Sequence, residues 1–233
     1  MPSLSWKRFA LPVSVLLIVA YWAASAWAQL SRAGGGSLPG SVRAIAVFVC
    51  LKTAVAVAVV WTLLRANEER LADLRFTGPS LKAAFVWGPL IAAGAFLLVD
   101  VVLGSTLKAL GTPTRPQALP ALFRDPREAP LWVFAAVVGG GFTEELIRAF
   151  VLTRFDRALG RIGLAVAVVV DTFVFGLGHL YQGVTGAIQA GASGLLFALI
   201  FLRRRRAADS MVVHALFDLF GVALAYLLYA GKH

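Results

Sequence analysis

The chain has 233 residues, of which 59% are hydrophobic and only 15% are charged, and its mean hydropathy is +0.80. An average soluble domain carries about 25% charged residues, so this composition excludes an ordinary soluble protein and indicates a membrane protein. The net charge of +10 does not indicate nucleic-acid binding, because the basic residues are spread between apolar runs instead of forming one stripe. The single cysteine, Cys50, lies inside an apolar run and supports neither a disulfide nor a cysteine cluster.

Several apolar runs are long enough to cross a bilayer, which takes about 20 residues of helix. They cover residues 9–29, 44–64, 83–107, 131–153, 162–180, 183–202 and 209–229. We therefore expect an all-α, polytopic integral membrane protein with about seven transmembrane helices. Residues 1–82 are expected to form N-terminal transmembrane helices and a cytoplasmic connector, and residues 83–233 a helical core.

The basic residues are divided unequally between the two sides of the membrane that these runs define. Thirteen Lys and Arg residues lie on the side of the N-terminus and seven on the other side, which predicts a cytoplasmic N-terminus. The alanine- and arginine-rich composition suggests the inner membrane of a bacterium. Residues 9–29 also fit a signal peptide cleaved after Ala28, although this run is longer than the usual apolar region, so its retention stays open.

Seven ionisable side chains fall inside the last four apolar runs. They are Glu144, Glu145, Arg148, Asp171, His179, His214 and Asp218. A charged group at the bilayer centre costs about 2.5 to 3.5 kcal/mol on insertion scales, and such residues usually face the bundle interior or water and mark functional sites. We expect these side chains to turn inward. Two others, Lys52 and Asp100, are predicted to pair across the bundle, which would offset their insertion cost.

The spacing of these residues places several of them on common helix faces. Arg148 follows Glu144 by four positions and Glu145 by three, so it can reach either carboxylate. Pairs four positions apart in the later runs are Phe175 with His179 and His214 with Asp218. An isolated Glu–Arg pair can be purely structural, but acids and two imidazoles on three helices provide the groups for hydrolysis by activated water. No Ser or Cys accompanies a base in these motifs, which argues against a covalent intermediate.

Three motifs in this order resemble those of the CPBP family of intramembrane proteases, which includes the type II CAAX prenyl endopeptidases and bacterial Abi-type proteins. The motifs of that family are EExxxR, FxxxH and HxxxN or HxxxD on successive core helices. The second and third are matched by "FGLGH" and "HALFD", and the similarity covers about Leu131 to Tyr229. In the first motif, Arg148 follows Glu145 by three positions where the family usually has four.

Two registers of the first motif therefore stay open. If the glutamates are aligned, Glu144 is the catalytic base, both acids are kept, and Glu145 and Arg148 are its supporting neighbours; we prefer this register. If the arginine is aligned instead, Thr143 takes the place of the first glutamate and Glu144 that of the second. The second register would remove the first acid and threaten activity.

The resemblance implies an intramembrane endopeptidase with a catalytic core formed by the last four helices. In that family pattern, Glu144 and His179 activate a water molecule, while His214 and Asp218 stabilise the tetrahedral oxyanion. The implied partners are the lipid bilayer and a membrane-bound or prenylated, CAAX-type protein or peptide, with no nucleic acid.

Other interpretations stay open beside this one. Zinc held by Glu144, His179 and His214, with water in a fourth position, is one alternative; because HExxH is absent, metal-free catalysis is preferred. The displaced arginine also allows a catalytically silent immunity or partner-binding protein of the same family. Intramembrane acids and histidines can instead mark a proton or ion pathway.

The depths of the three principal groups present a difficulty for all of these sites. With straight helices rising about 1.5 Å per residue, Glu144 lies near the middle of the membrane. His179 then lies near the outer end of its run and His214 near the inner end of its own. These groups meet only if helix tilt, a kink near Gly176 and Gly178, or a water-filled cavity brings them together.

Overall fold

The structure is a computed structural model, and it describes residues 7–31, 41–74, 81–114, 123 and 125–230. Throughout these residues the regular structure is helical, and no strand occurs in them. The expected all-α fold is thereby confirmed. In chain order the elements are α1 (Lys7–Ser31), α2 (Val42–Ala66), η1 (Leu71–Leu74), α3 (Leu81–Phe96), η2 (Leu97–Leu103), α4 (Gly104–Ala109), η4 (Pro126–Glu128), α5 (Ala129–Phe134), η5 (Ala135–Glu144), α6 (Glu145–Gly178), η6 (Leu180–Gln182), α7 (Gly183–Arg204) and α8 (Ala207–Tyr229).

The number of membrane spans differs from the number expected. Among the described residues, six continuous helical stretches are long and apolar enough to cross a membrane, against about seven predicted. The difference arises because 131–153 and all but the last two residues of 162–180 fall within one stretch of 53 residues, Pro126–Gly178. A straight helix of this length would extend about 80 Å, whereas the hydrocarbon core is about 30 Å thick.

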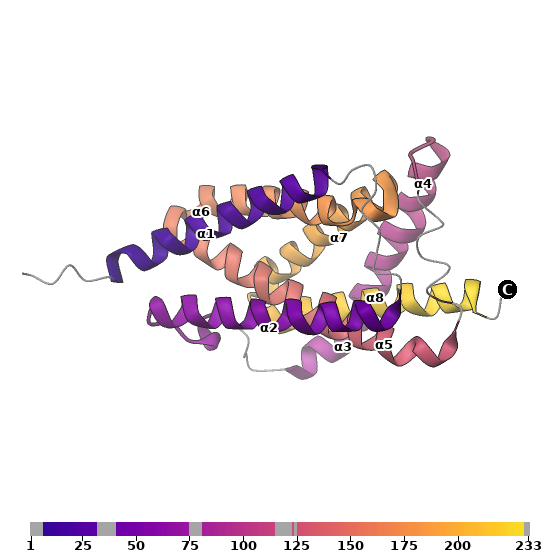
Figure 1. The fold of residues 1–233 in the computed structure, drawn as a ribbon, viewed down its shortest axis with the longest axis horizontal. Coiled ribbons are helices and arrows are strands. Elements are labelled where there is room, and N and C mark those ends of the chain that lie inside the picture. The colour runs from indigo at the N-terminus through magenta and orange to yellow at the C-terminus, as the bar shows by residue number, and fades with distance from the viewer. Residues whose placement is uncertain (1–6, 32–40, 75–80, 115–122, 124, 231–233) are drawn as a thin grey trace, which may run out of the picture.

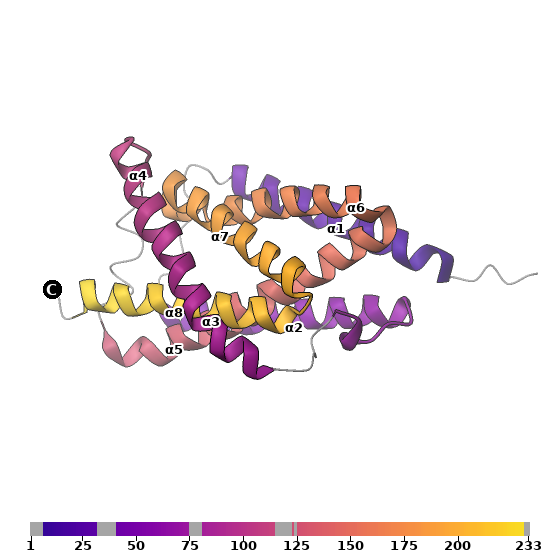
Figure 2. The same ribbon diagram turned by 180° about the vertical axis from the view of Figure 1, so that it is seen from behind.

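A bend at Gly160 resolves this excess length. Its backbone angles, φ 62° and ψ −152°, are not helical and lie where a residue without a Cβ atom is favoured. Figure 2 shows α6 turning back on itself at the end of the molecule. The stretch therefore consists of two helical arms, and the boundary that the sequence placed between two helices is the sharp bend that joins them.

The helices form an elongated bundle (Figures 1 and 2). The second arm of α6 runs with α1 along one long side, α2, α5 and α8 lie along the other, and α7 runs diagonally between them. Packing contacts agree with this view: α1 lies against α6, α2 against η5, α3 against α8, and α7 against both α6 and α8. The junction of η5 and α6 is thus enclosed by α2 on one side and α8 on the other.

The bundle has an apolar outer surface, and a few charged side chains are buried in its otherwise apolar core. Large apolar side chains such as Phe48, Phe85 and Leu90 are exposed on the outside of the bundle. In contrast, Arg148 and Glu145 are among the largest fully buried side chains. Because charged groups are costly in lipid, this pattern fits a bundle whose outer surface faces acyl chains and whose polar groups face one another.

Candidate active site

The site begins where η5 passes into α6. Glu144 is the last residue of η5, a π-helical segment, and Glu145 is the first residue of α6. Neighbouring residues on a helix point in different directions, so the two carboxylates reach different partners. π-helical turns are rare and frequently occur at functional sites.

Glu145 belongs to a buried ion-pair network with Arg148 and Asp171. The Arg148 Nη1 atom donates a hydrogen bond to Glu145, and Nε donates one of 3.0 Å to Asp171 Oδ2. The guanidinium also lies over the ring of Phe175, 4.7 Å from its centroid. The sequence left open which glutamate Arg148 would contact; in the structure it is Glu145, so Glu144 is available for other partners.

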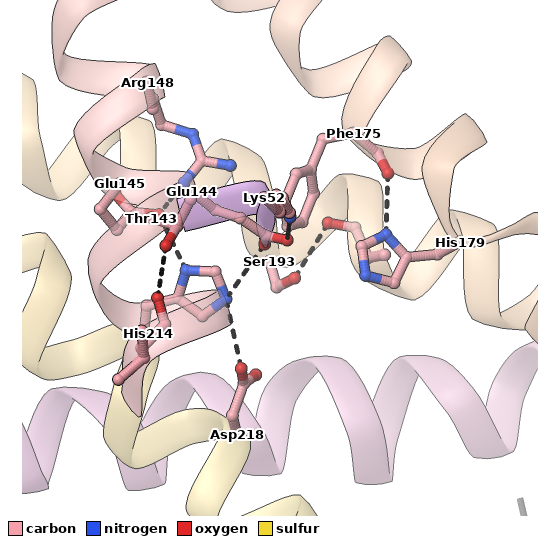
Figure 3. A network of polar contacts seen from close by, with 12 residues as sticks. Lys52, Thr143, Glu144, Glu145, Arg148, Phe175, His179, Ser193, His214 and Asp218 are labelled. Atoms are coloured by element: carbon pink, nitrogen blue, oxygen red, sulfur yellow. Dashed lines mark hydrogen bonds and ion pairs between the residues drawn. The ribbon is translucent and has the colours of Figure 1, made fainter. Parts of the chain in front are cut away.

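His214 lies at the centre of the polar cluster (Figure 3). It is 3% exposed and stacks on Phe197 with a centroid separation of 4.2 Å. Its Nδ1 atom is 2.9 Å from Glu145 Oε1. Its Nε2 atom is 3.9 Å from Glu144 Oε2 and 3.6 Å from Asp218 Oδ2. The structure therefore brings Glu144, His214 and Asp218 together in spite of the depths expected for straight helices.

His179 is held in a defined orientation at the end of α6. Its Nδ1 atom is 2.9 Å from the Phe175 carbonyl oxygen. A carbonyl only accepts, so Nδ1 must donate, and in the neutral imidazole this leaves Nε2 as an acceptor. The ring of Phe175 lies 4.8 Å from that of His179 and 6.1 Å from that of His214. Among the described contacts, no hydrogen bond or ion pair links His179 directly to Glu144.

Lys52 of α2 also contributes to the site. Its Nζ atom donates a hydrogen bond of 2.6 Å to Glu144 Oε1 (Figure 3). The predicted pair of Lys52 with Asp100 is therefore wrong: Asp100 accepts a hydrogen bond of 3.0 Å from Gln189. The reason is the packing of the bundle, in which α2 lies against η5 while η2 lies against α7. The sequence marks Lys52 as a charged residue inside an apolar run, but it does not identify the acid with which Lys52 pairs.

Two of the three glycines before Glu144, Gly140 and Gly141, allow α8 to approach η5 closely, while Gly139 faces Val49 of α2. A Cβ atom at Gly140 would overlap the Asp218 carboxylate and lie 3.2 Å from His214 Nε2. At Gly141 it would lie 2.6 Å from the Ala215 Cβ atom and 3.0 Å from the Met211 carbonyl oxygen. The sequence alone assigns these glycines no role, whereas the structure shows that they lie in the packing of the site.

Alanine substitutions at these two glycines are expected to have different effects. Gly140→Ala meets the end of a flexible side chain, so the protein should fold while the Asp218 carboxylate moves away from His214. A misplacement of this size lowers kcat/KM by about 10- to 100-fold. Gly141→Ala meets backbone and a neighbouring Cβ atom, so it should lower stability by about 1 to 3 kcal/mol. Thermal unfolding in detergent and peptide turnover measure the two effects; equal melting temperatures for both variants would contradict this distinction.

The three residues suggested as zinc ligands, Glu144, His179 and His214, do not form one compact group of donors in the described part of the chain. Within the described part of the chain, no group of three or more His, Cys, Asp or Glu side chains is placed to hold a metal ion. Of the suggested ligands, Glu144 is hydrogen-bonded by the Lys52 ammonium, whereas the Nδ1 contacts of His179 and His214 leave the Nε2 atom of each ring without a short hydrogen bond. Zinc sites use several free nitrogen, sulfur or carboxylate donors around one centre, and a bound cation beside Lys52 would be repelled.

The fold and the site together define an all-helical membrane protein with a cluster of acids and imidazoles at its centre. Residues 126–220 match the family model described as type II CAAX prenyl endopeptidase Rce1-like. This match confirms the resemblance to the CPBP family, and it spans all four of the residues predicted to be catalytic. The family is one of membrane proteases, which supports a hydrolase. No curated protein and no solved structure matches the chain.

Proposed function

We propose that the protein is an intramembrane endopeptidase that hydrolyses a peptide bond of a membrane-bound or prenylated, CAAX-type protein or peptide. The observation that carries this proposal is the placement of Glu144 Oε2 3.9 Å from His214 Nε2. This separation is too long for a direct hydrogen bond, and one water molecule can bridge such a gap. A carboxylate and an imidazole on opposite sides of a water molecule are suited to general acid–base hydrolysis.

In the proposed mechanism Glu144 removes a proton from this water molecule, and the resulting hydroxide attacks the scissile carbonyl carbon. His179, whose Nε2 is free to accept, assists the deprotonation. His214 and Asp218, whose Nε2 and Oδ2 atoms lie 3.6 Å apart, then stabilise the oxyanion of the tetrahedral intermediate by hydrogen bonding. When the C–N bond breaks, Glu144 returns the proton to the leaving amine.

The geometry favours the register in which both glutamates are kept. The hydroxyl of Thr143 donates a 2.6 Å hydrogen bond to the Val138 carbonyl and is fully buried. A hydroxyl that is buried and donates to a carbonyl is poorly suited to act as a general base. Glu144 reaches His214, and Glu145 joins Arg148 even though the arginine is displaced by one position. This arrangement supports Glu144 as the base of the proposed enzyme.

The substrate class follows from the family match and from the apolar outer surface. A prenyl group partitions into the bilayer at about 0.8 kcal/mol per buried CH₂ group, so lipidation concentrates a substrate at the membrane-embedded site. We propose a bacterial inner membrane, as the alanine- and arginine-rich composition suggests, and a cytoplasmic N-terminus, as the distribution of basic residues predicts.

The test is cleavage of a fluorogenic peptide by the full chain purified into liposomes. A farnesylated CAAX peptide is expected to be cut on the N-terminal side of its three last residues, at least about tenfold faster than the same peptide without the lipid. Mass spectrometry identifies both products, and a His214→Ala preparation controls for contaminating proteases. Turnover should persist with EDTA or 1,10-phenanthroline. Equal rates from wild type and His214→Ala would overturn the proposed function, and loss of turnover with chelators that zinc restores would overturn its metal-free form.

A further inference from the structure

Helix α2 lies outside the family-matched segment, yet two adjacent residues of α2 contact two adjacent residues of the site. Lys52 hydrogen-bonds to Glu144, and the hydroxyls of Thr53 and Thr143 are 2.7 Å apart. Both contacts join residues about 90 positions apart in the chain, and both fall at the end of η5. The register of α2 against η5 is therefore fixed by a pair of polar contacts at the base itself.

The contact with Lys52 determines which oxygen of Glu144 is free. Lys52 Nζ is 2.6 Å from Oε1, while Oε2 faces His214. The side chains of Lys52 and Glu144 are 29% and 21% exposed, so the ion pair borders open space instead of being sealed in the core. An ammonium on one oxygen holds the carboxylate plane and leaves the other oxygen toward the water molecule that it would deprotonate.

The balance of charge at the site gives Lys52 a second role. Four carboxylates lie in the network, and they belong to Glu144, Glu145, Asp171 and Asp218. The guanidinium of Arg148 is engaged by Glu145 and Asp171. Among the described ion pairs, Lys52 is the permanently charged cation that contacts Glu144. Without Lys52, the Glu144 carboxylate would lie near other carboxylates with no permanently charged cation in contact.

We infer that Lys52 is a positioning residue of the active site: it orients the Glu144 carboxylate and supplies its counter-charge from a helix outside residues 126–220, which match the family model. This inference rests on the proposed function, since it assigns Lys52 a part in the same reaction. The site is then completed by α2, and residues 126–220 alone do not contain all the groups that hydrolysis requires.

The first test is kinetic and uses the full chain in liposomes. Lys52→Met keeps the length of the side chain and removes the charge. We expect kcat to fall about 100-fold with KM changed less than about threefold, because the interaction acts on the base and not on substrate binding. Lys108→Met is the matched control: it makes the same substitution at an exposed lysine of α4 outside the site and should keep kcat within about threefold of wild type. A wild-type kcat for Lys52→Met would overturn the inference.

Chemical rescue separates a role of the charge from a merely structural one. In Lys52→Ala, ethylammonium can enter the vacated space and should restore kcat at least about tenfold, whereas ethanol should not. Failure of the amine, or equal rescue by the alcohol, would overturn the inference. If Lys52→Met does not fold, Lys52→Gln keeps a hydrogen-bond donor without the charge; a low kcat supports the inference and a wild-type kcat overturns it.

A double-mutant cycle distinguishes failure of this inference from failure of the proposed function. The melting temperatures of Lys52→Met, Glu144→Gln and the double variant need no substrate, and non-additive shifts are expected if the two side chains interact. A wild-type protein that cleaves no CAAX-type peptide would remove the proposed function and the positioning role with it. Additive shifts together with normal wild-type cleavage would remove the Lys52–Glu144 coupling alone.

Discussion

Glu144→Gln is expected to abolish measurable peptide hydrolysis, with kcat/KM lowered by about 10³-fold or more. Removal of a positioned general base accounts for about 10²- to 10⁴-fold, and glutamine has nearly the same shape but accepts no proton. The side chain of Glu144 is partly exposed and its partner Lys52 remains able to donate to the amide oxygen. The variant should therefore fold and insert like wild type while losing turnover.

The same substitution elsewhere in the chain provides the control. Glu128 lies at the start of the family-matched segment, in η4, away from the polar cluster. Glu128→Gln should keep wild-type kcat/KM and the same melting temperature. If Glu144→Gln retained full turnover, Glu144 would not be the base. A different outcome is that neither wild type nor Glu128→Gln cleaves any lipidated peptide, while cells that carry Glu144→Gln keep the wild-type phenotype. This outcome would support the alternative of a catalytically silent, partner-binding protein.

The sequence predicted which residues meet better than it predicted how they meet. Charges in apolar runs are costly enough that they had to face inward, and this argument led to Glu144, His214 and Asp218. Their contact could not be derived from depth along straight helices. It depends on how α8 crosses η5, and the close approach of these two helices at Gly140 and Gly141 is a property of packing between segments about 70 residues apart.

The differences from the expectations have the same physical origin. The described residues form six continuous apolar stretches against about seven expected, because the two arms of Pro126–Gly178 are joined by a bend at Gly160 and not by a break. The partner of Lys52 was wrong because an intramembrane lysine must find an acid, but several acids were available and only the arrangement of helices selects among them. Local spacing identifies candidate groups, whereas pairing across the bundle is decided by tertiary contacts.

Arg148→Met is expected to have the largest effect on stability. The Arg148 side chain is 2% exposed and those of Glu145 and Asp171 are 0% and 13% exposed. Removal of the guanidinium leaves two carboxylates close together without their cation, beside a Glu145 Oε2 atom that has no hydrogen-bond partner among the described residues. Removing one partner of a buried ion pair typically costs about 3 to 5 kcal/mol. Unfolding in mixed micelles with increasing SDS measures this loss.

Arg157→Met is the matched control because it breaks an ion pair of a different kind. Arg157 is 40% exposed and pairs with Glu69, which Arg154 also contacts, so Glu69 keeps a cation. Exposed ion pairs contribute about 0 to 1 kcal/mol to the free energy of unfolding. The unfolding midpoint of Arg157→Met should therefore stay close to that of wild type. Adding Glu145→Gln to Arg148→Met should recover part of the loss, since one uncompensated charge is removed. If burial of uncompensated carboxylates were not the cause, the double variant would be no more stable than Arg148→Met, and this outcome would assign the cost to lost packing against Phe175 instead.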